Sequence, residues 1–208
     1  GSGGIAGGGG LTMTGPGTVT LQTANTYTGA TSIGGGSLTI GGAGYLGGGT
    51  YSASITNNGA LAFNSSAAQT LAGAVSGAGS LSQLGSGTLT FSNANPYTGD
   101  TVINASTLKL SPSGSLASGN ISIASGATLA VATQPAPVLT ANQNLLGAGA
   151  VNGSLTTAAT SKIYAGTDGA AGTLTFNNNL TNVTGSAFNL DVSASAGSGN
   201  DRVTVTGA

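Results

Sequence analysis

Few residues of this chain could act as an acid, a base, a nucleophile or a metal ligand. The sequence holds three Lys or Arg and four Asp or Glu residues, with no His and no Cys. The carboxylates are all aspartates and lie far apart in the sequence, at Asp100, Asp168, Asp191 and Asp201. General acid–base catalysis needs groups placed together on the substrate, and a Ser or Thr nucleophile needs a nearby base, for which Lys109 and Lys162 are the candidates. We interpret both lysines as solvated, and expect no enzymatic activity, no catalytic residue and no cofactor.

One aspartate has a sequence context that is typical of metal binding. Gly199-Asn200-Asp201-Arg202-Val203 is similar to half of the Gly-x-Asp-x-aliphatic core of calcium-binding nonapeptide repeats. In those repeats, Asp and backbone carbonyls supply hard oxygen ligands between tandem turns. The sequence holds one copy, so we interpret Asp201 as a turn carboxylate and keep calcium as the alternative. Asp201 and Arg202 are adjacent, and neighbours on a strand point to opposite faces, which argues against a mutual ion pair.

Two further positions invite a binding interpretation because the same residues occur twice. Asn25 and Asn95 each stand in an Ala-Asn-x-Tyr segment, followed by Tyr27 and Tyr97. Amide side chains at such places commonly hydrogen-bond the backbone of a turn, so we predict that role for the asparagines rather than ligand binding. The tyrosines either stack on a glycan or close a corner of the fold, and the sequence leaves both open.

The composition limits the elements that can position these residues. The chain is 208 residues long with a net charge of -1, 39 Gly and 38% hydrophobic residues. Abundant Gly and the lack of Glu–Lys pairs argue against long helices, while alternating apolar residues argue against disorder. Without a basic stripe, nucleic acid is not an expected partner. No apolar run reaches the roughly 18 residues of a membrane-spanning helix, and we find no signal peptide.

A long internal repeat is the main signal in the sequence. Residues 11–40 (LTMTGPGTVTLQTANTYTGATSIGGGSLTI) align without gaps to residues 81–110 (LSQLGSGTLTFSNANPYTGDTVINASTLKL). A shorter pattern, a small residue followed by alternating apolar positions, predicts strands of four or five residues. These segments are 17–21, 36–40, 59–63, 79–83, 87–91, 106–110, 127–131, 153–157 and 172–176.

The spacing of these strands indicates a solenoid. Val19 is followed by Leu38, Leu61 by Leu81, and Leu89 by Leu108 and Leu129, at intervals close to the length of one β-helix coil. We therefore predict an all-β parallel β-helix of about ten coils of roughly 20 residues, rising about 4.8 Å each to about 50 Å. Leu89 and Phe91 would point inward, and Thr88 and Thr90 outward. An antiparallel sandwich is the alternative, but it has no reason to keep so long a register between two copies of one segment.

The repeated segment carries a family resemblance. The pattern Leu-x-x-x-Gly-x-Gly-Thr-[Leu/Val]-Thr-[Leu/Phe]-x-x-Ala-Asn-x-Tyr-Thr-Gly-x-Thr-x-Ile, present at 11–40 and 81–110, closely resembles the autotransporter-associated β-strand repeat, also called the passenger-associated transport repeat. The resemblance implies a right-handed parallel β-helix and efficient export of a passenger through the outer membrane. It also implies an extracellular or cell-surface location on a Gram-negative bacterium. A C-terminal transmembrane barrel is not seen in this sequence.

The predicted organisation is one solenoid. Residues 1–165 would form β-helix coils, and residues 166–208 further coils or a capping segment, with strands at 188–192 and 200–205. We expect the natural chain to continue beyond Ala208. The primary functional hypothesis is a non-enzymatic stalk that aids export and presents other domains. The alternative is an adhesin or filament subunit that self-associates through solenoid ends or Thr-rich faces, since a net charge near zero removes repulsion. Host or matrix glycans are further possible partners, and a glycan-active enzyme is disfavoured.

Overall fold

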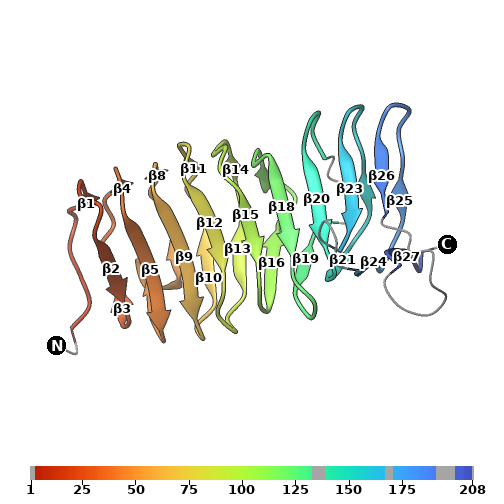
Figure 1. Ribbon diagram of the computed structural model, residues 1–208. Coiled ribbons are helices and arrows are strands. Elements are labelled where there is room, and N and C mark those ends of the chain that lie inside the picture. The colour runs from red at the N-terminus through yellow and green to blue at the C-terminus, as the bar shows by residue number, and fades with distance from the viewer. Residues whose placement is uncertain (1–2, 133–138, 167–170, 191–199, 208) are drawn as a thin grey trace.

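The chain folds into a parallel β-helix, as the sequence predicts. The computed structural model describes residues 3–132, 139–166, 171–190 and 200–207. Within these ranges every pairing between two strands is parallel, and the only helix is one 3-10 turn, η1 (Gly47–Gly49). The coils stack in chain order into an elongated body, with the N- and C-termini at opposite ends (Figure 1).

Two long sheets follow the helix axis: the nine-stranded sheet starts in the first coil with β2, and the eight-stranded sheet starts in the second coil with β7. The nine-stranded sheet has the order β2 (Thr18–Leu21), β5 (Ser37–Gly42), β9 (Ala60–Ser65), β12 (Ser80–Gln83), β15 (Thr101–Ile103), β18 (Asn120–Ile123), β20 (Asn144–Gly147), β23 (Lys162–Ala165) and β26 (Ala187–Asn189). The eight-stranded sheet has the order β7 (Thr50–Tyr51), β10 (Gln69–Leu71), β13 (Leu89–Phe91), β16 (Thr107–Leu110), β19 (Thr128–Ala130), β21 (Ala150–Asn152), β24 (Thr173–Phe176) and β27 (Arg202–Val205).

The third side of the helix is made of shorter pieces. The four-stranded sheet consists of β1 (Leu11–Met13), β4 (Thr31–Ile33), β8 (Ile55–Asn57) and β11 (Val75–Ser76). Three strand pairs complete the fold: β14 (Ala94–Asn95) with β17 (Ser115–Leu116), β22 (Leu155–Thr156) with β25 (Leu180–Thr181), and β3 (Ala24–Asn25) with β6 (Tyr45–Leu46). The backbone N–H of Tyr97 donates to the carbonyl of Val75 at 3.2 Å, so β14 lies directly beyond β11.

The coil count of about ten was an overestimate, because several coils are longer than predicted. The structure has about eight turns. In the nine-stranded sheet Ser37 pairs with Ala60, Asn120 with Asn144 and Lys162 with Ala187, and each of these steps exceeds the predicted coil length. Part of the added length in the second coil is η1, where Gly48 has a φ of +69°. Eight turns at about 4.8 Å each give a length of about 38 Å instead of about 50 Å.

The strand pattern in the sequence was interpreted correctly. Each of the nine predicted segments contains a strand, and the predicted stacking pairs are true register partners, for example Val19 with Leu38 and Leu108 with Leu129. Alternation explains this result, since a small residue at each corner is followed by one inward aliphatic position and its outward neighbours.

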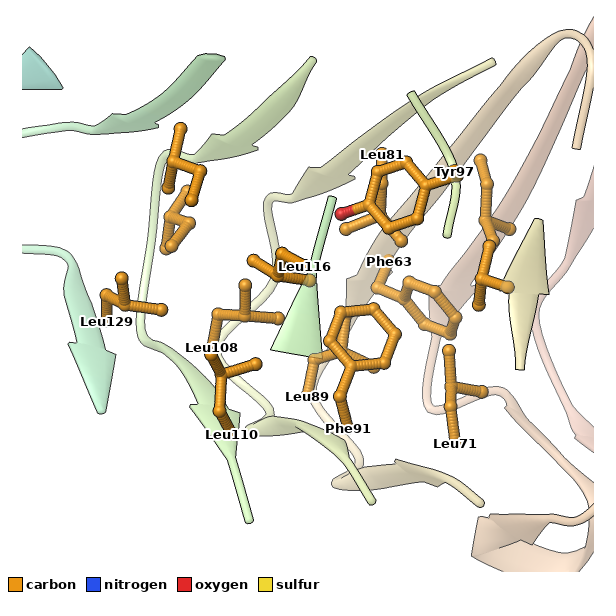
Figure 2. Packing of buried hydrophobic residues seen from close by; sticks show 14 of the residues in the cluster. Phe63, Leu71, Leu81, Leu89, Phe91, Tyr97, Leu108, Leu110, Leu116 and Leu129 are labelled. Atoms are coloured by element: carbon orange, nitrogen blue, oxygen red, sulfur yellow. The ribbon is translucent and has the colours of Figure 1, made fainter. Parts of the chain in front are cut away.

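The core is a continuous stack of apolar side chains along the helix axis. Leu89 and Phe91 are 1% and 0% exposed and pair with Leu108 and Leu110 of the next coil. Figure 2 shows the middle of this stack, from Phe63 and Leu81 to Leu129. Thr88 and Thr90 lie on the outer side and are half-buried. Each fully buried Leu or Phe contributes roughly 1.5–3 kcal/mol, so inward positions hold successive coils together.

The last described strands pair with the coils before them. β24 pairs with β21 and with β27, and β26 pairs with β23. The predicted strand at 188–192 corresponds to β26, and the part of it from 191 onward lies outside the described residues. Within the part of the chain that the structure describes, no helix is long and apolar enough to cross a membrane.

Candidate functional site

The repeated Ala-Asn-x-Tyr segment folds into the same hydrogen-bonded corner twice. We call residues 23–31 and 93–101 the repeat turns. In the first turn, the Oδ1 of Asn25 accepts the backbone N–H of Ile5 at 2.9 Å. Its Nδ2 donates to the carbonyls of Thr23 at 2.6 Å and Tyr45 at 3.3 Å. Ile5 belongs to the coil before Asn25 and Tyr45 to the coil after it, so one side chain joins three successive coils.

The second repeat turn repeats this arrangement at the same sequence offsets. The Oδ1 of Asn95 accepts the N–H of Val75 at 2.9 Å. Its Nδ2 donates to the carbonyls of Asn93 at 2.6 Å and Ser115 at 3.1 Å. Asn25 and Asn95 are each 1% exposed. The prediction that these amides bond turn backbone is therefore confirmed, and neither side chain is open to a ligand.

The tyrosines of the repeat turns lie in the core. Tyr27 is 1% exposed and Tyr97 is 0% exposed, and their hydroxyls hydrogen-bond the Oγ1 of Thr31 and Thr101 respectively. A ring so deeply buried cannot stack on a sugar, so the corner-closing alternative is the correct one. Burial raises the pKa of Tyr27 to about 12 and also raises the pKa of Tyr97 above its usual value. Both phenols stay protonated at neutral pH.

The two turns differ in the side chain of the following coil that bonds their threonine. In the first, Thr31 Oγ1 also hydrogen-bonds the hydroxyl of Tyr51 at 2.8 Å, and the Tyr51 ring meets Tyr27 edge-on with centroids 5.5 Å apart. In the second, Thr101 Oγ1 donates to Ser118 Oγ at 2.9 Å. Neither Tyr51 nor Ser118 belongs to the repeated segment. Sequence reasoning missed both because their places depend on the lengths of the following coils.

The glycine of each repeat turn is required by close coil-to-coil approach. A Cβ added to Gly99 would clash with the backbone of Gly79, and one added to Gly29 would lie 2.5 Å from the backbone of Gly9 and Gly10. Such contacts leave no room for a side chain. The repeat turn is thus a clamp between coils, made of buried amide, phenol and backbone groups.

The two repeats lie on different sides of the helix. In residues 11–40, β1 belongs to the four-stranded sheet and β2 and β5 to the nine-stranded sheet. In residues 81–110, the equivalent β12 belongs to the nine-stranded sheet, and β13 and β16 to the eight-stranded sheet. The second repeat is therefore advanced by one side of the helix relative to the first, although its turn keeps the same hydrogen bonds.

The structure scatters the charged residues instead of gathering them. Lys109 and Lys162 are exposed on different sheets, and Arg202 is exposed on β27. Asp201 Oδ1 accepts the backbone N–H of Gly172 at 2.9 Å, and Asp168 and Asp191 lie outside the described residues. Among the residues that the structure describes, no group of three or more His, Cys, Asp or Glu side chains could hold a metal ion.

A row of polar side chains was not recognised in the sequence. Asn120 Nδ2 donates to Asp100 Oδ1 at 2.8 Å, and Asn144 Nδ2 donates to Asn120 Oδ1 at 2.8 Å. The three residues come from successive coils and lie on the outer face of the nine-stranded sheet. Their separations in the sequence are each close to one coil, which is the signal that would have found them.

A cavity of about 330 Å³ opens near β17 and β19. Its apolar lining comes from three coils, and its polar contribution comes from Gln143, Thr140 and serines. None of its lining residues is ionisable, so it offers no acid or base. The residues that line it are Leu110, Ser111, Pro112, Ser113, Gly114, Ser115, Leu116, Ala117, Ile121, Leu129, Val131, Ala132, Leu139, Thr140, Gln143 and Leu155.

Comparison with known proteins identifies the repeated segment. A family model described as passenger-associated-transport-repeat matches residues 11–40 and again residues 81–110. These are the two segments that contain the repeat turns. No curated protein and no solved structure matches the chain.

Proposed function

Because this chain carries two passenger-associated transport repeats of autotransporter passengers in one parallel β-helix, we propose that it is a non-enzymatic stalk. In this proposal it is a passenger segment of a Gram-negative bacterium, exported with the help of its repeats to the cell surface or the medium. There it holds neighbouring domains away from the cell. The family and the fold support a passenger-type structural role, and the stalk and export functions are the specific form that we propose.

The observation that carries this proposal is the clamp made by each repeat turn. Asn95 binds backbone groups of its own coil and of the coils directly before and after it. A chain that crosses a membrane in extended form can make such contacts as soon as neighbouring coils have emerged, because no distant segment is needed. Contacts of this kind favour coil-by-coil folding on the far side of the membrane.

A stalk also needs stiffness along its axis. The nine-stranded and eight-stranded sheets run continuously through the coils, and inward Leu, Ile and Phe residues stack from coil to coil. Since each coil contacts only its neighbours, further coils lengthen the rod without changing its cross-section.

The export part is tested by display of this chain between a surface epitope and an outer-membrane translocator. We expect the double variant Asn25→Ala/Asn95→Ala to reduce the amount of epitope at the surface several-fold. Asn64→Ala, an exposed asparagine on β9, is the matched control and should leave display unchanged. Equal display of both variants would refute the role of the repeat turns in export. The stalk part is tested by electron microscopy of the purified protein, where isolated rods are expected and compact globules would contradict it.

Self-association is a second candidate function, and exposed apolar side chains near the last described coils favour it. Val183, Phe188 and Leu190 are 38%, 39% and 43% exposed, and Val205 on β27 is 46% exposed. Exposed strand edges with apolar residues are a template for pairing with another chain. Sedimentation over a range of concentrations separates the two functions, because a spacer stays monomeric and an associating subunit grows. Phe188→Ser should then reduce the growth.

A further inference from the structure

The outer face of the nine-stranded sheet changes character along the helix. In its first four strands, two neighbouring columns of outward positions carry small uncharged residues: Thr18, Thr20, Ser37, Thr39, Ala60, Ala62, Ser80 and Ser82. In the next four coils, the same two columns include charged, amide and larger apolar side chains. The polar row is Asp100, which directly precedes β15 and hydrogen-bonds Asn120, followed by Asn120, Asn144 and Lys162. The second row is Val102, Ser122, Leu146 and Tyr164.

The polar row is held in one orientation by its own hydrogen bonds. Asn144 donates to Asn120, and Asn120 donates to Asp100, so both amides point their N–H groups toward the N-terminal end. Asn120, Asn144 and Lys162 are consecutive register partners, and strands of neighbouring coils lie about 4.8 Å apart. The row is therefore a straight line of polar groups along the helix axis, about three strand spacings long.

The two asparagines keep hydrogen-bonding capacity that the row does not use. An amide has two N–H donors and two lone pairs on its oxygen. Asn120 uses one donor and one lone pair within the row, and Asn144 uses one donor. Both side chains are partly exposed, so an unused donor and an unused acceptor of each can face solvent side by side.

The second row supplies an apolar surface beside these polar groups. Leu146 and Tyr164 are partly exposed and stand two residues beyond Asn144 and Lys162 on β20 and β23. Two residues of strand span about 6.6 Å. A molecule lying along the axis can thus touch amides on one side and an aromatic ring on the other.

We propose that this face binds a linear neutral glycan that lies along the helix axis. Neighbouring hydroxyls of a sugar ring are paired donors and acceptors that match an amide, and the C–H face of the ring packs on an aromatic side chain. The charges at the two ends of the polar row, Asp100 and Lys162, cancel, so the row has no net attraction for a polyanion. This binding is separate from the stalk function and adds an adhesive activity to it.

The test is affinity electrophoresis of the whole chain against soluble neutral polysaccharides of several linkages, with heparin as the polyanionic comparison. We expect retardation by at least one neutral glycan. Tyr164→Ala and Asn144→Ala should each weaken binding at least about tenfold. The matched control is Thr39→Ala, an outward position of the same sheet on β5, which should bind as the unchanged chain does.

Circular dichroism and thermal unfolding verify that each variant keeps the fold. Tyr164→Phe is a second, milder variant that retains the ring and should retain most of the binding. The proposal is overturned if no neutral glycan retards the chain, if heparin is preferred, or if Thr39→Ala loses as much binding as Tyr164→Ala.

Discussion

The two repeats provide a comparison within one molecule, because the same turn is built on different sides of the helix. Val19 is followed in register by Leu38, Leu61 and Leu81 on the nine-stranded sheet. Its equivalent in the second repeat is Leu89, which lies beyond Leu81 in the same coil, on the eight-stranded sheet. Both turns nevertheless make the same amide bonds to the preceding and following coils.

The repeat therefore specifies contacts between coils rather than a place on a sheet. On the four-stranded sheet, Leu11 stands in register with Thr31, Ile55 and Val75 of the three coils that follow. Leu81, the equivalent of Leu11 in the second repeat, comes after Val75 in the chain and lies on the next side of the helix. The distance between the two copies is therefore not a whole number of coils. The turn tolerates this because its partners are backbone groups, which every side of the helix provides. Successive copies of such a repeat would face different directions around the rod.

The surroundings of the two turns also differ. The first turn packs on residues 3–10, which form no strand and are exposed. The second packs on β11, between coils that are themselves paired on both sides. The same hydrogen bonds therefore lie beside exposed residues in the first turn and between paired coils in the second. Variants of the two turns can measure how much this difference changes the stability that each turn contributes.

The largest effect is expected from Asn95→Ala. This change removes the hydrogen-bond partner of the N–H of Val75 and of the carbonyls of Asn93 and Ser115. Each buried group that stays unpaired lowers stability by about 1–3 kcal/mol. We expect a loss of about 3–5 kcal/mol for Asn95→Ala. Asn25→Ala should cost about 1–3 kcal/mol, because water can reach the exposed residues before β1. Denaturant unfolding followed by circular dichroism gives the comparison.

Hydrogen exchange of the Val75 amide gives a local measurement for the same variant, which is useful because solenoids need not unfold as one unit. Asn64→Ala serves as the control and should stay within about 0.5 kcal/mol of the unchanged chain. If Asn95→Ala behaves like Asn64→Ala, the clamp is not a source of stability. If Asn25→Ala costs as much as Asn95→Ala, the environment of the turn does not matter.

A smaller effect is expected at high pH, through the buried tyrosines. Burial raises the pKa of Tyr27 to about 12 in the folded state, against 10.0 for a free side chain, and raises that of Tyr97 as well. Folding thus favours the protonated phenol. The stability that the protonated Tyr27 phenol contributes is fully present below about pH 10 and is lost as the pH rises through about 12. One pKa unit corresponds to about 1.36 kcal/mol, so the loss for Tyr27 is roughly 2–3 kcal/mol.

Phenylalanine variants test this origin of the pH dependence. Tyr27→Phe and Tyr97→Phe should each cost about 1 kcal/mol at neutral pH, because a hydroxyl bond to Thr31 or Thr101 is lost. Each should also reduce the alkaline destabilisation, since the removed phenol cannot ionise. Thermal unfolding at pH 7 and pH 11, with tyrosinate absorbance as a second signal, measures both effects. An unchanged pH dependence in the double variant would contradict the assignment.

Much of this fold could be predicted because its core follows a simple rule. Segments such as Gly87-Thr88-Leu89-Thr90-Phe91 place an inward apolar residue at every coil, and the spacing of Leu89, Leu108 and Leu129 equals their register. The backbone role of Asn25 and Asn95 also followed from residue type. Local pattern thus determines strands, inward faces and the nature of the turns.

The lengths of the corners could not be predicted, and several features depend on them. The number of turns, the shift of the second repeat to another sheet, and the pairing of Thr101 with Ser118 all require a known register. The same holds for Asp100, Asn120 and Asn144, which align only when a longer coil is placed between the last two. Corners made of Gly, Ser and Pro carry little pattern, so their lengths are set by packing.

The smallest effect in this series concerns a position where the two repeats carry different residues. Met13 in the first repeat corresponds to Gln83 in the second, and Gln83 stands between Phe63 and Ile103 in an otherwise apolar column. Its Nε2 donates to the carbonyls of Gly85 and Gly87, which are buried, whereas the equivalent Gly15 and Gly17 are exposed. In this structure the Gln83 amide is thus the donor for two carbonyls that the preceding coil shields from water.

We expect Gln83→Met to cost about 1 kcal/mol. The two glycine carbonyls lose their donor, but Oε1 of Gln83 has no hydrogen-bond partner among the described residues, so its removal offsets part of that loss. Denaturant unfolding measures this cost, and a Gln83→Met variant more stable than the unchanged chain would mean that the two glycine carbonyls do not depend on the Gln83 amide.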